Sequence, residues 1–269
     1  MKTRKIIFGI IAVICIVAVN FSIYWQFFRK KGNEPSVTPV IEEAKIISDF
    51  NQLFNNSINY QGVNITVNNK IDQMQDLIYT AYSNKERKED KYELNVNIPA
   101  ININSNNVIN INSQIENIFR TKANNILLQT IDKTIYSVEY TAYINTNILS
   151  LVIKSTLKEG NNPQRVIVKT YNYNLSTGEE LTLAQILEIK GLSRDSVENE
   201  IQKKIKEANE KATQFENLGY NVYTRDLTSN MYQVGNTGNY FLGEKNMLYI
   251  IYPYGNQNNT SEMDVILFE

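Results

Sequence analysis

The stretch YSVEYTAYINTNILSLVIKS, Tyr136–Ser155, contains two extended runs separated by a polar turn. Apolar and aromatic side chains recur at every second position, as at Tyr136, Val138 and Tyr140, which predicts strands with one buried face. A third run of the same kind follows the turn at Gly160. We therefore predict an antiparallel three-stranded meander, with these strands: Ile135–Tyr143, Ile148–Leu157 and Arg165–Leu175.

Helical patterns lie on both sides of this meander. Apolar residues spaced by three and four predict a helix over Val108–Leu127, capped by Asn106 or Asn107. Thr182 and Gln185 have the spacing of a capping box at the start of a short helix that Gly191 can close. A longer helix is predicted from Ser193 to Gly219, with this apolar face: Val197, Ile201, Ile205, Ala208, Ala212 and Phe215.

Further strands are predicted at both ends of this region. Leu77–Tyr82 and Tyr92–Pro99 should pair through a loop at Ser83–Lys91, whose charge run is typical of a solvated turn. Three more strands close the chain: Asn239–Leu242, Met247–Tyr254 and Met263–Phe268. Strands without regular βαβ alternation indicate an α+β fold with a mostly antiparallel sheet and helices on one side. We expect the Val197 helix to pack on the meander.

A single transmembrane helix is predicted before this domain. Ile6–Phe28 carries no charged residue and lies between basic clusters. At about 1.5 Å per residue it spans about 35 Å, enough to cross the hydrocarbon core. The alternatives are a cleaved signal peptide or a lipoprotein signal at Cys15, but the apolar run is long for the first, and Ile14 does not suit the second.

The segments around the span give a predicted domain order. It comprises a cytoplasmic tail (1–5), the transmembrane helix (6–28), a linker (29–39), a membrane-proximal helical segment (40–75) and an extracytoplasmic α+β domain (76–269). The helical segment rests on apolar residues spaced by three and four from Val40 to Phe54.

The orientation of the predicted transmembrane helix depends on the basic residues that flank it, and their numbers on the two sides are nearly equal. Long domains translocate largely regardless of such charge. We expect the bulk of the chain to be extracellular at the cell membrane. The alternative is a domain tethered inside the cell.

Composition excludes several classes of function. The chain contains no histidine, which removes the commonest general base and metal ligand. Its formal net charge of −1, with interleaved signs, gives no electrostatic footprint for nucleic acid. We expect no cofactor, no metal site and no catalytic residue, since an enzyme here would need paired carboxylates, a lysine base or a tyrosine.

Four segments together resemble a known domain. They are KYELNVNIPAIN (Lys91–Asn102), the Tyr136–Ser155 stretch, YNYNLSTGEELTLAQIL (Tyr171–Leu187) and YFLGEKNMLYIIYPYG (Tyr240–Gly255). They are similar to the extracytoplasmic domain shared by RsiV-type anti-sigma factors and PdaC-type peptidoglycan deacetylases, over about Asp76–Glu269. In the RsiV-type anti-sigma factors this domain is an external receptor that binds lysozyme. The resemblance therefore implies a lysozyme-binding domain outside the membrane.

This sequence departs from both groups. Five residues before the span are too few to hold a sigma factor, and no deacetylase domain with metal-binding histidines follows. The turn EGNNPQR, Glu159–Arg165, also lacks the histidine that family members often carry there. We therefore expect neither role to carry over.

The sequence predicts a membrane-anchored extracytoplasmic binding or sensor domain. It is expected to be non-catalytic and to recognise a lysozyme-like protein or peptidoglycan. The alternative is a carboxylate-dependent cell-wall hydrolase or other envelope enzyme. An enzyme should show clustered buried acids in a deep cleft, whereas a binding domain should show an exposed aromatic patch.

Candidate ligand-binding residues lie in the closing segment: Tyr249, Tyr252, Pro253 and Tyr254. Proline has no N–H for a strand ladder and so favours an edge strand, where a partner can dock. Tyrosines give large contact areas at low entropy cost. The competing interpretation is that these rings only pack the final strands.

Overall fold

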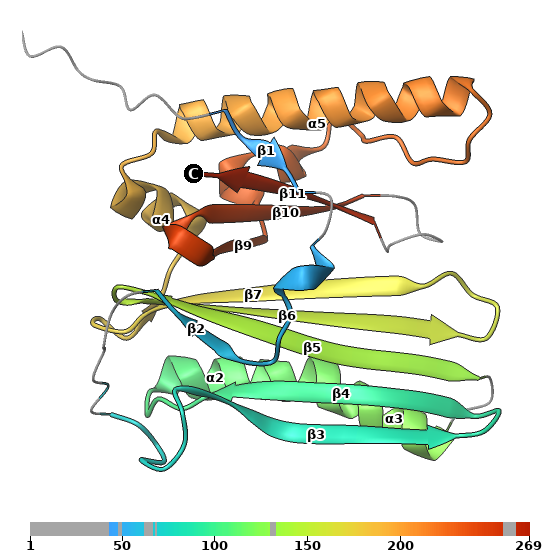
Figure 1. Cartoon of the computed structure of the whole chain (residues 1–269). Coiled ribbons are helices and arrows are strands. Elements are labelled where there is room, and N and C mark those ends of the chain that lie inside the picture. The colour runs from blue at the N-terminus through green and yellow to red at the C-terminus, as the bar shows by residue number, and fades with distance from the viewer. Residues whose placement is uncertain (1–42, 48–49, 62–66, 68, 130–132, 255–261) are drawn as a thin grey trace, which may run out of the picture. The chain divides into compact units, whose positions relative to one another are not determined.

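The computed structural model describes residues 43–47, 50–61, 67, 69–129, 133–254 and 262–269. All of them belong to one compact unit, Ile41–Glu269. Two sheets organise this unit (Figure 1). A seven-stranded sheet has the order β3-β4-β5-β6-β7-β8, with β2 beside β5, and a four-stranded sheet has the order β1-β11-β10-β9.

The strands of the seven-stranded sheet are β2 (Ile58–Tyr60), β3 (Ile78–Lys88), β4 (Tyr92–Ile101), β5 (Thr134–Asn145), β6 (Ile148–Glu159), β7 (Arg165–Asn174) and β8 (Glu179–Glu180). Those of the four-stranded sheet are β1 (Lys45–Ile46), β9 (Asn239–Leu242), β10 (Leu248–Tyr254) and β11 (Glu262–Phe268). Among these strands only the β4–β5 and β2–β5 pairs are parallel. The α+β class and the mostly antiparallel pairing are therefore confirmed.

The predicted meander is present as β5, β6 and β7. Its strands pair antiparallel, with Val138 opposite Ser155 and Leu151 opposite Tyr171. The predicted apolar faces are buried in one core cluster with the helical residues Val108 and Phe119. The alternation therefore identified the buried face correctly.

One helical stretch covers this face and contains a π-helical turn. It comprises α2 (Asn106–Ile115), the π segment η2 (Glu116–Arg120) and α3 (Thr121–Gln129). The predicted cap was wrong by one or two residues. Ser105 is extended, and its Oγ accepts a hydrogen bond from the backbone N–H of Val108 at 3.3 Å.

Two more helices pack on the four-stranded sheet: α4 (Leu183–Lys190) and α5 (Arg194–Asn217). The capping box of Thr182 and Gln185 is present, and Gly191 ends α4 with a φ of +66°. The expectation that α5 packs on the meander was wrong. Its buried residues Val197 and Ile201 instead share a core cluster with Ile250 of β10, because a second sheet provides the apolar surface. The helices therefore lie on two sheets rather than on one side of one sheet.

A third apolar cluster lies between the two sheets. Tyr143 and Val152 of the seven-stranded sheet meet Phe241, Tyr249 and Ile251 of the four-stranded sheet. The rings of Phe241 and Tyr249 are stacked, with centroids 4.5 Å apart. Both faces of the central strands are therefore covered, which explains why long runs of β5 and β6 are buried at consecutive positions.

Polar side chains also tie β9 to the seven-stranded sheet. Asn172 Nδ2 donates to the Tyr240 carbonyl at 2.8 Å, and Ser150 Oγ accepts from the Leu242 N–H at 3.1 Å. Asn145 Nδ2 donates to the Leu242 carbonyl at 3.1 Å. The peptide groups of an edge strand usually lack such partners. Here the neighbouring sheet supplies them.

The helix predicted over Val40–Phe54 is absent from the described part of that segment. The described residues 43–47 and 50–61 instead contain β1, a 3-10 turn at Asn51–Leu53 and β2. Ala44 is buried against α5, whereas Phe50 and Phe54 pack between the sheets. The apolar spacing of three and four therefore reflects two separate burial sites rather than one helical face.

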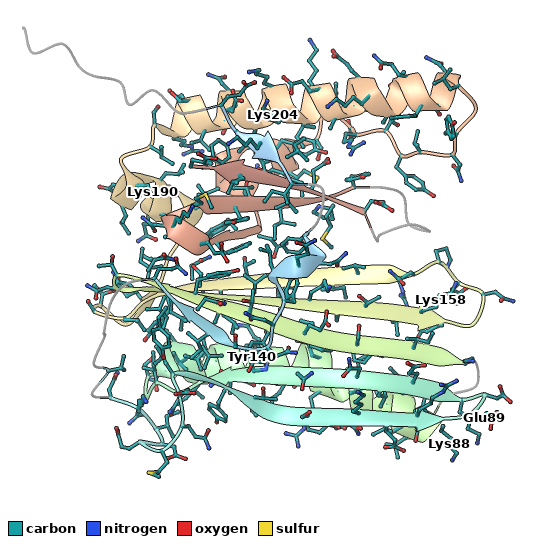
Figure 2. The ribbon with its side chains drawn as sticks, in the orientation of Figure 1. Lys88, Glu89, Tyr140, Lys158, Lys190 and Lys204 are labelled. Carbon is teal, nitrogen blue, oxygen red and sulfur yellow. The ribbon has the colours of Figure 1, made fainter. Side chains whose placement is uncertain are left out.

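The β3–β4 hairpin is longer than predicted. β3 continues through the predicted loop to Lys88, and Ser83 lies opposite Asn97. The charged residues Lys88 and Glu89 lie at the tip of this hairpin (Figure 2). β3 is an edge strand, where charged side chains are tolerated because one side faces solvent.

The predicted tail (1–5), transmembrane helix (6–28) and linker (29–39) lie outside the described residues. Among the helices that are described, none combines the length and apolar composition needed for a membrane crossing.

Candidate functional site

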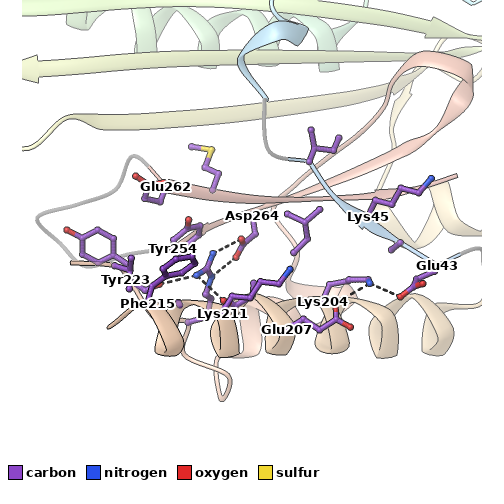
Figure 3. Close-up of a pocket in the computed structure, with 18 of the residues that line it drawn as sticks. Glu43, Lys45, Lys204, Glu207, Lys211, Phe215, Tyr223, Tyr254, Glu262 and Asp264 are labelled. Carbon is purple, nitrogen blue, oxygen red and sulfur yellow. Dashed lines mark hydrogen bonds and ion pairs between the residues drawn. The ribbon is translucent and has the colours of Figure 1, made fainter. Parts of the chain in front are cut away.

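A cavity of about 910 Å³ lies between α5 and the edge of the four-stranded sheet (Figure 3). α5, β1, β11, the end of β10 and the segment 221–225 contribute to its lining. We name it the α5 groove, and the lining residues used below are Glu43, Lys204, Glu207, Phe215, Tyr223, Arg225, Tyr254 and Asp264. Its volume is in the range typical of ligand pockets.

A buried ion pair forms one end of the groove. Arg225 Nε lies 2.9 Å from Asp264 Oδ2, and its Nη2 lies 2.8 Å from Oδ1. The two side chains are only 9% and 4% exposed. Burial alone would lower the pKa of Arg225, but the hydrogen bonds and charge of Asp264 raise it. This bidentate geometry is the stronger form of a charge-assisted hydrogen bond.

The same guanidinium holds two neighbouring elements in place. It lies 3.7 Å from the centroid of the Tyr254 ring, and its Nη1 donates to the Tyr223 carbonyl at 3.1 Å. Arg225 thus joins the returning segment to the ends of β10 and β11. All of these contacts are internal, so Arg225 shapes the groove rather than offering a free cation.

A second group of charges lies farther along α5, where Lys204 meets Glu43 just before β1 (Figure 3). Its Nζ lies 3.0 Å from Glu43 Oε1 and 3.2 Å from Glu207 Oε2. Burial alone would lower the pKa of Lys204, but the hydrogen bonds that its ammonium donates to these carboxylates raise it. The hydrogen bond that Glu43 accepts from Lys204 lowers the pKa of Glu43. These contacts fix β1, and with it the start of the described chain, against α5.

An exposed apolar cluster adjoins the groove where α5 ends. Phe215, Leu218 and Tyr220 are 51%, 73% and 62% exposed. The rings of Phe215 and Tyr220 meet edge to face, with centroids 5.8 Å apart. We name these three residues the α5 patch. Contiguous exposed apolar side chains of this kind often mark interaction sites.

The charged groups of the groove suit binding better than proton transfer. Asp264, Glu43 and Glu207 each form an ion pair with a basic residue. A general acid among carboxylates needs an environment that favours its protonated form, whereas these partners favour the charged form. Within the described residues, no group of three histidine, cysteine or acidic side chains is arranged to hold a metal ion.

Two of the four predicted ligand residues lie in the core. Tyr249 and Tyr252 are 5% and 1% exposed. Tyr252 shares a hydrogen bond of 2.8 Å with the hydroxyl of Thr237, and its ring meets that of Tyr232 edge to face. Burial raises the pKa of the Tyr252 phenol. Neither ring presents a surface to a partner, because sheet and helix cover the two faces of β10.

The other two residues lie at the end of the strand. Tyr254 is half-buried and lines the α5 groove, and Pro253 is exposed. The edge position predicted from the proline is confirmed at Pro253 itself, although β9 and β11 flank Leu248–Ile251 on both sides. Beyond Ile251 the strand pairs with β11 alone. Pro253 occupies that part, where its missing N–H removes no contact with β9.

Sequence reasoning missed most of this site. Phe215 was assigned to the buried face of its helix, yet it is half-exposed because the apolar stripe of α5 extends beyond the surface it covers. The apolar residues Leu218 and Tyr220, which follow the end of α5, could have indicated an exposed apolar patch there. Arg225 and Asp264 are 39 residues apart, and no local pattern pairs them.

No family model and no curated protein matches this chain. Two solved structures are similar to parts of it. One, from Pseudomonas aeruginosa PAO1, is 10% identical over 43% of this chain and 66% of its own, with a TM-score of 0.26. The other, from Bacteroides fragilis NCTC 9343, is 12% identical over 65% of this chain and 80% of its own, with a TM-score of 0.30.

Both are described as DUF3298 family proteins. The match spans just under two thirds of the first structure. Because both TM-scores are below 0.5, neither likeness decides the architecture or the function of this chain. The functional argument therefore rests on the residues of the site.

Proposed function

We propose that this chain is a membrane-anchored extracytoplasmic binding or sensor domain without catalytic activity, and that it recognises a lysozyme-like protein or a cell-wall ligand through the α5 groove and the α5 patch. The observation that carries this proposal is the exposure of Phe215 and Tyr220 beside a cavity of about 910 Å³. Aromatic residues are enriched among the residues that dominate protein interfaces.

The ion pairs of the groove support this role because they make its walls rigid. Arg225 and Lys204 each hold two elements together, so that the groove can receive a partner with little loss of side-chain entropy. The sequence resemblance to RsiV-type and PdaC-type domains makes a lysozyme-like protein the first ligand to try. Peptidoglycan is the second.

The double variant Phe215→Ala and Tyr220→Ala tests the proposed surface. We expect it to weaken binding of lysozyme to the full chain in detergent at least tenfold, or about 1.4 kcal/mol, because it removes the exposed rings. Isothermal titration calorimetry measures this change, and the melting temperature should stay nearly constant.

Leu128→Ala is the matched control, since Leu128 is 79% exposed on α3, outside the α5 groove and the α5 patch. It should leave the affinity unchanged. The proposal fails if the parent protein binds neither lysozyme nor purified peptidoglycan. Equal affinity of the parent and the double variant would instead reject the α5 patch as the surface.

Localisation at the cell membrane, with the bulk of the chain outside, is part of the same proposal. Protease added to intact protoplasts should digest the domain, because an external domain is accessible without lysis. Immunoblotting of the carboxy-terminal region measures this. Protection in intact protoplasts, followed by digestion after lysis, would reverse the orientation.

A further inference from the structure

A cavity of about 460 Å³ lies on the face of the seven-stranded sheet that α2, η2 and α3 partly cover. Its lining residues are Ile118, Lys122, Tyr136, Ser155, Leu157, Arg165, Val166 and Ile167. We name it the β7 pocket. It shares no lining residue with the α5 groove, and its volume is in the range typical of ligand pockets.

The strand register places the floor of the pocket on the same face as the helices. Val138, which belongs to the core cluster under the helices, lies opposite Ser155, and Ser155 lies opposite Ile167. Residues directly opposite one another in a sheet share a face. The helical stretch packs mainly on β4, three strands away from β7. Ile167 is therefore left 48% exposed beside the helices.

The helical wall of the pocket contains the π turn η2. The N–H of Thr121 donates to the carbonyl of Glu116, five residues earlier, instead of four as in an α-helix. Phe119 of this turn is 0% exposed in the core, whereas Ile118 is only partly buried and lines the pocket. Single π turns within α-helices occur frequently at functional sites. The irregular part of the helix thus coincides with the cavity.

Two cations and one carboxylate meet at one end of the pocket. Lys122 Nζ lies 2.7 Å from Glu159 Oε1, and Arg165 Nη2 donates to Oε2 of the same carboxylate. Glu159 follows Leu157 by two residues on the same face of β6, so these ion pairs adjoin the pocket there. The hydrogen bond from Lys122 lowers the pKa of Glu159, which keeps it ionised. The cluster therefore carries a net charge of about +1 at neutral pH.

The rest of the lining restricts the chemistry of a ligand. Leu157 and Ile118 add apolar surface to that of Ile167. The Tyr136 hydroxyl already donates to the Phe119 carbonyl at 3.3 Å, so the floor needs no polar partner. β7 contains no acidic residue. The side chains of Lys122 and Arg165 are 36% and 49% exposed, so that both can meet an added anion. The pocket suits an apolar chain that ends in a negative charge.

We propose that the β7 pocket binds a medium-chain aliphatic carboxylate. The chain lies against Ile118, Leu157 and Ile167, and its removal from water stabilises the complex. The carboxylate accepts hydrogen bonds from Arg165 and Lys122, which strengthens binding because both partners are charged. This inference is independent of the ligand proposed for the α5 groove.

Isoleucine methyl NMR of the full chain in phosphatidylcholine nanodiscs tests the proposal, with octanoate, acetate and octylamine as probes. We expect octanoate to shift the signals of Ile118 and Ile167, each identified by its replacement with valine. Ile109 is the internal control, since it is 52% exposed on α2 and does not line the pocket. Acetate lacks the chain and octylamine reverses the charge, so both should bind at least tenfold more weakly than octanoate.

Two variants separate the contributions of charge and chain. Arg165→Gln should weaken octanoate binding about tenfold, because it removes a cation from the end of the pocket. Ile167→Thr should weaken it at least threefold, because it removes apolar surface while keeping a β-branched side chain. Ile135→Thr is the matched control, since Ile135 is 41% exposed and lies next to Tyr136 on β5, hence on the other face of the sheet. It should leave the affinity unchanged.

The proposal is overturned if octanoate shifts neither signal, if it shifts Ile109 as strongly as Ile167, or if acetate or octylamine binds as tightly as octanoate. Unchanged octanoate binding by Arg165→Gln or by Ile167→Thr would also overturn it. A shift of the Ile167 signal when phosphatidylglycerol replaces phosphatidylcholine, without octanoate, would assign the pocket to a lipid and reject the free carboxylate.

Discussion

Replacing Arg225 with alanine lowers the free energy of unfolding by about 3 to 5 kcal/mol, because it leaves the Asp264 carboxylate buried without its partner. Asp264 is 3% exposed, and Arg225 supplies two of its hydrogen bonds. The same change also removes the cation over the Tyr254 ring. Chemical denaturation followed by circular dichroism measures the loss.

Two variants test the explanation. Lys206→Ala breaks an exposed pair with Glu210, whose side chains are 68% and 60% exposed, and should change stability by no more than about 0.5 kcal/mol. The double variant Arg225→Met and Asp264→Leu removes both charges and should recover most of the lost stability. If Arg225→Ala and Lys206→Ala had equal effects, the pair would be solvated rather than buried.

Replacing Ile201 with aspartate should cost several kcal/mol and prevent stable packing of α5. Ile201 is 0% exposed within the apolar cluster that joins α5 to β10 and β11. An unpaired carboxylate at this position would be desolvated without a compensating partner. Thermal unfolding should show a large loss of stability or no cooperative transition.

Gln202→Asp is the control on the same helix, since Gln202 is exposed. It introduces the same side chain one residue away and should cost less than about 1 kcal/mol, mainly through helix propensity. Similar melting temperatures for both variants would show that α5 does not depend on the four-stranded sheet for its stability.

Local signals in the sequence predicted the elements that local interactions stabilise. The capping box of Thr182 and Gln185 involves neighbouring residues, as does the cap at Ser193, and both are present. The β5–β6–β7 meander was predicted for the same reason, because short turns connect strands with a clear alternation. The apolar face of Tyr136, Val138 and Tyr140 follows from that alternation.

Segments stabilised by distant partners were predicted poorly. Lys45 and Ile46 pair with β11, more than two hundred positions later, and the backbone N–H of Ile47 donates to the Val265 carbonyl. The spacing of apolar residues in this segment resembled that of a helix because Ala44 packs against α5, whereas Phe50 and Phe54 pack between the two sheets. β3 was predicted too short because cross-strand partners in β4, rather than the propensities of its polar residues, keep it extended.

The fold and the candidate site both contain features that follow from local sequence and features that depend on distant contacts. The sequence by itself determined the strands of the meander and their buried face, the starts of α4 and α5, and the apolar character of the α5 stripe, because these depend on neighbouring residues and on periodicity. Only the tertiary structure decided that α5 packs on a second sheet, that Tyr249 and Tyr252 are covered, and that Arg225 meets Asp264. Such contacts depend on how layers stack, and a single sequence carries no local record of which distant surfaces meet.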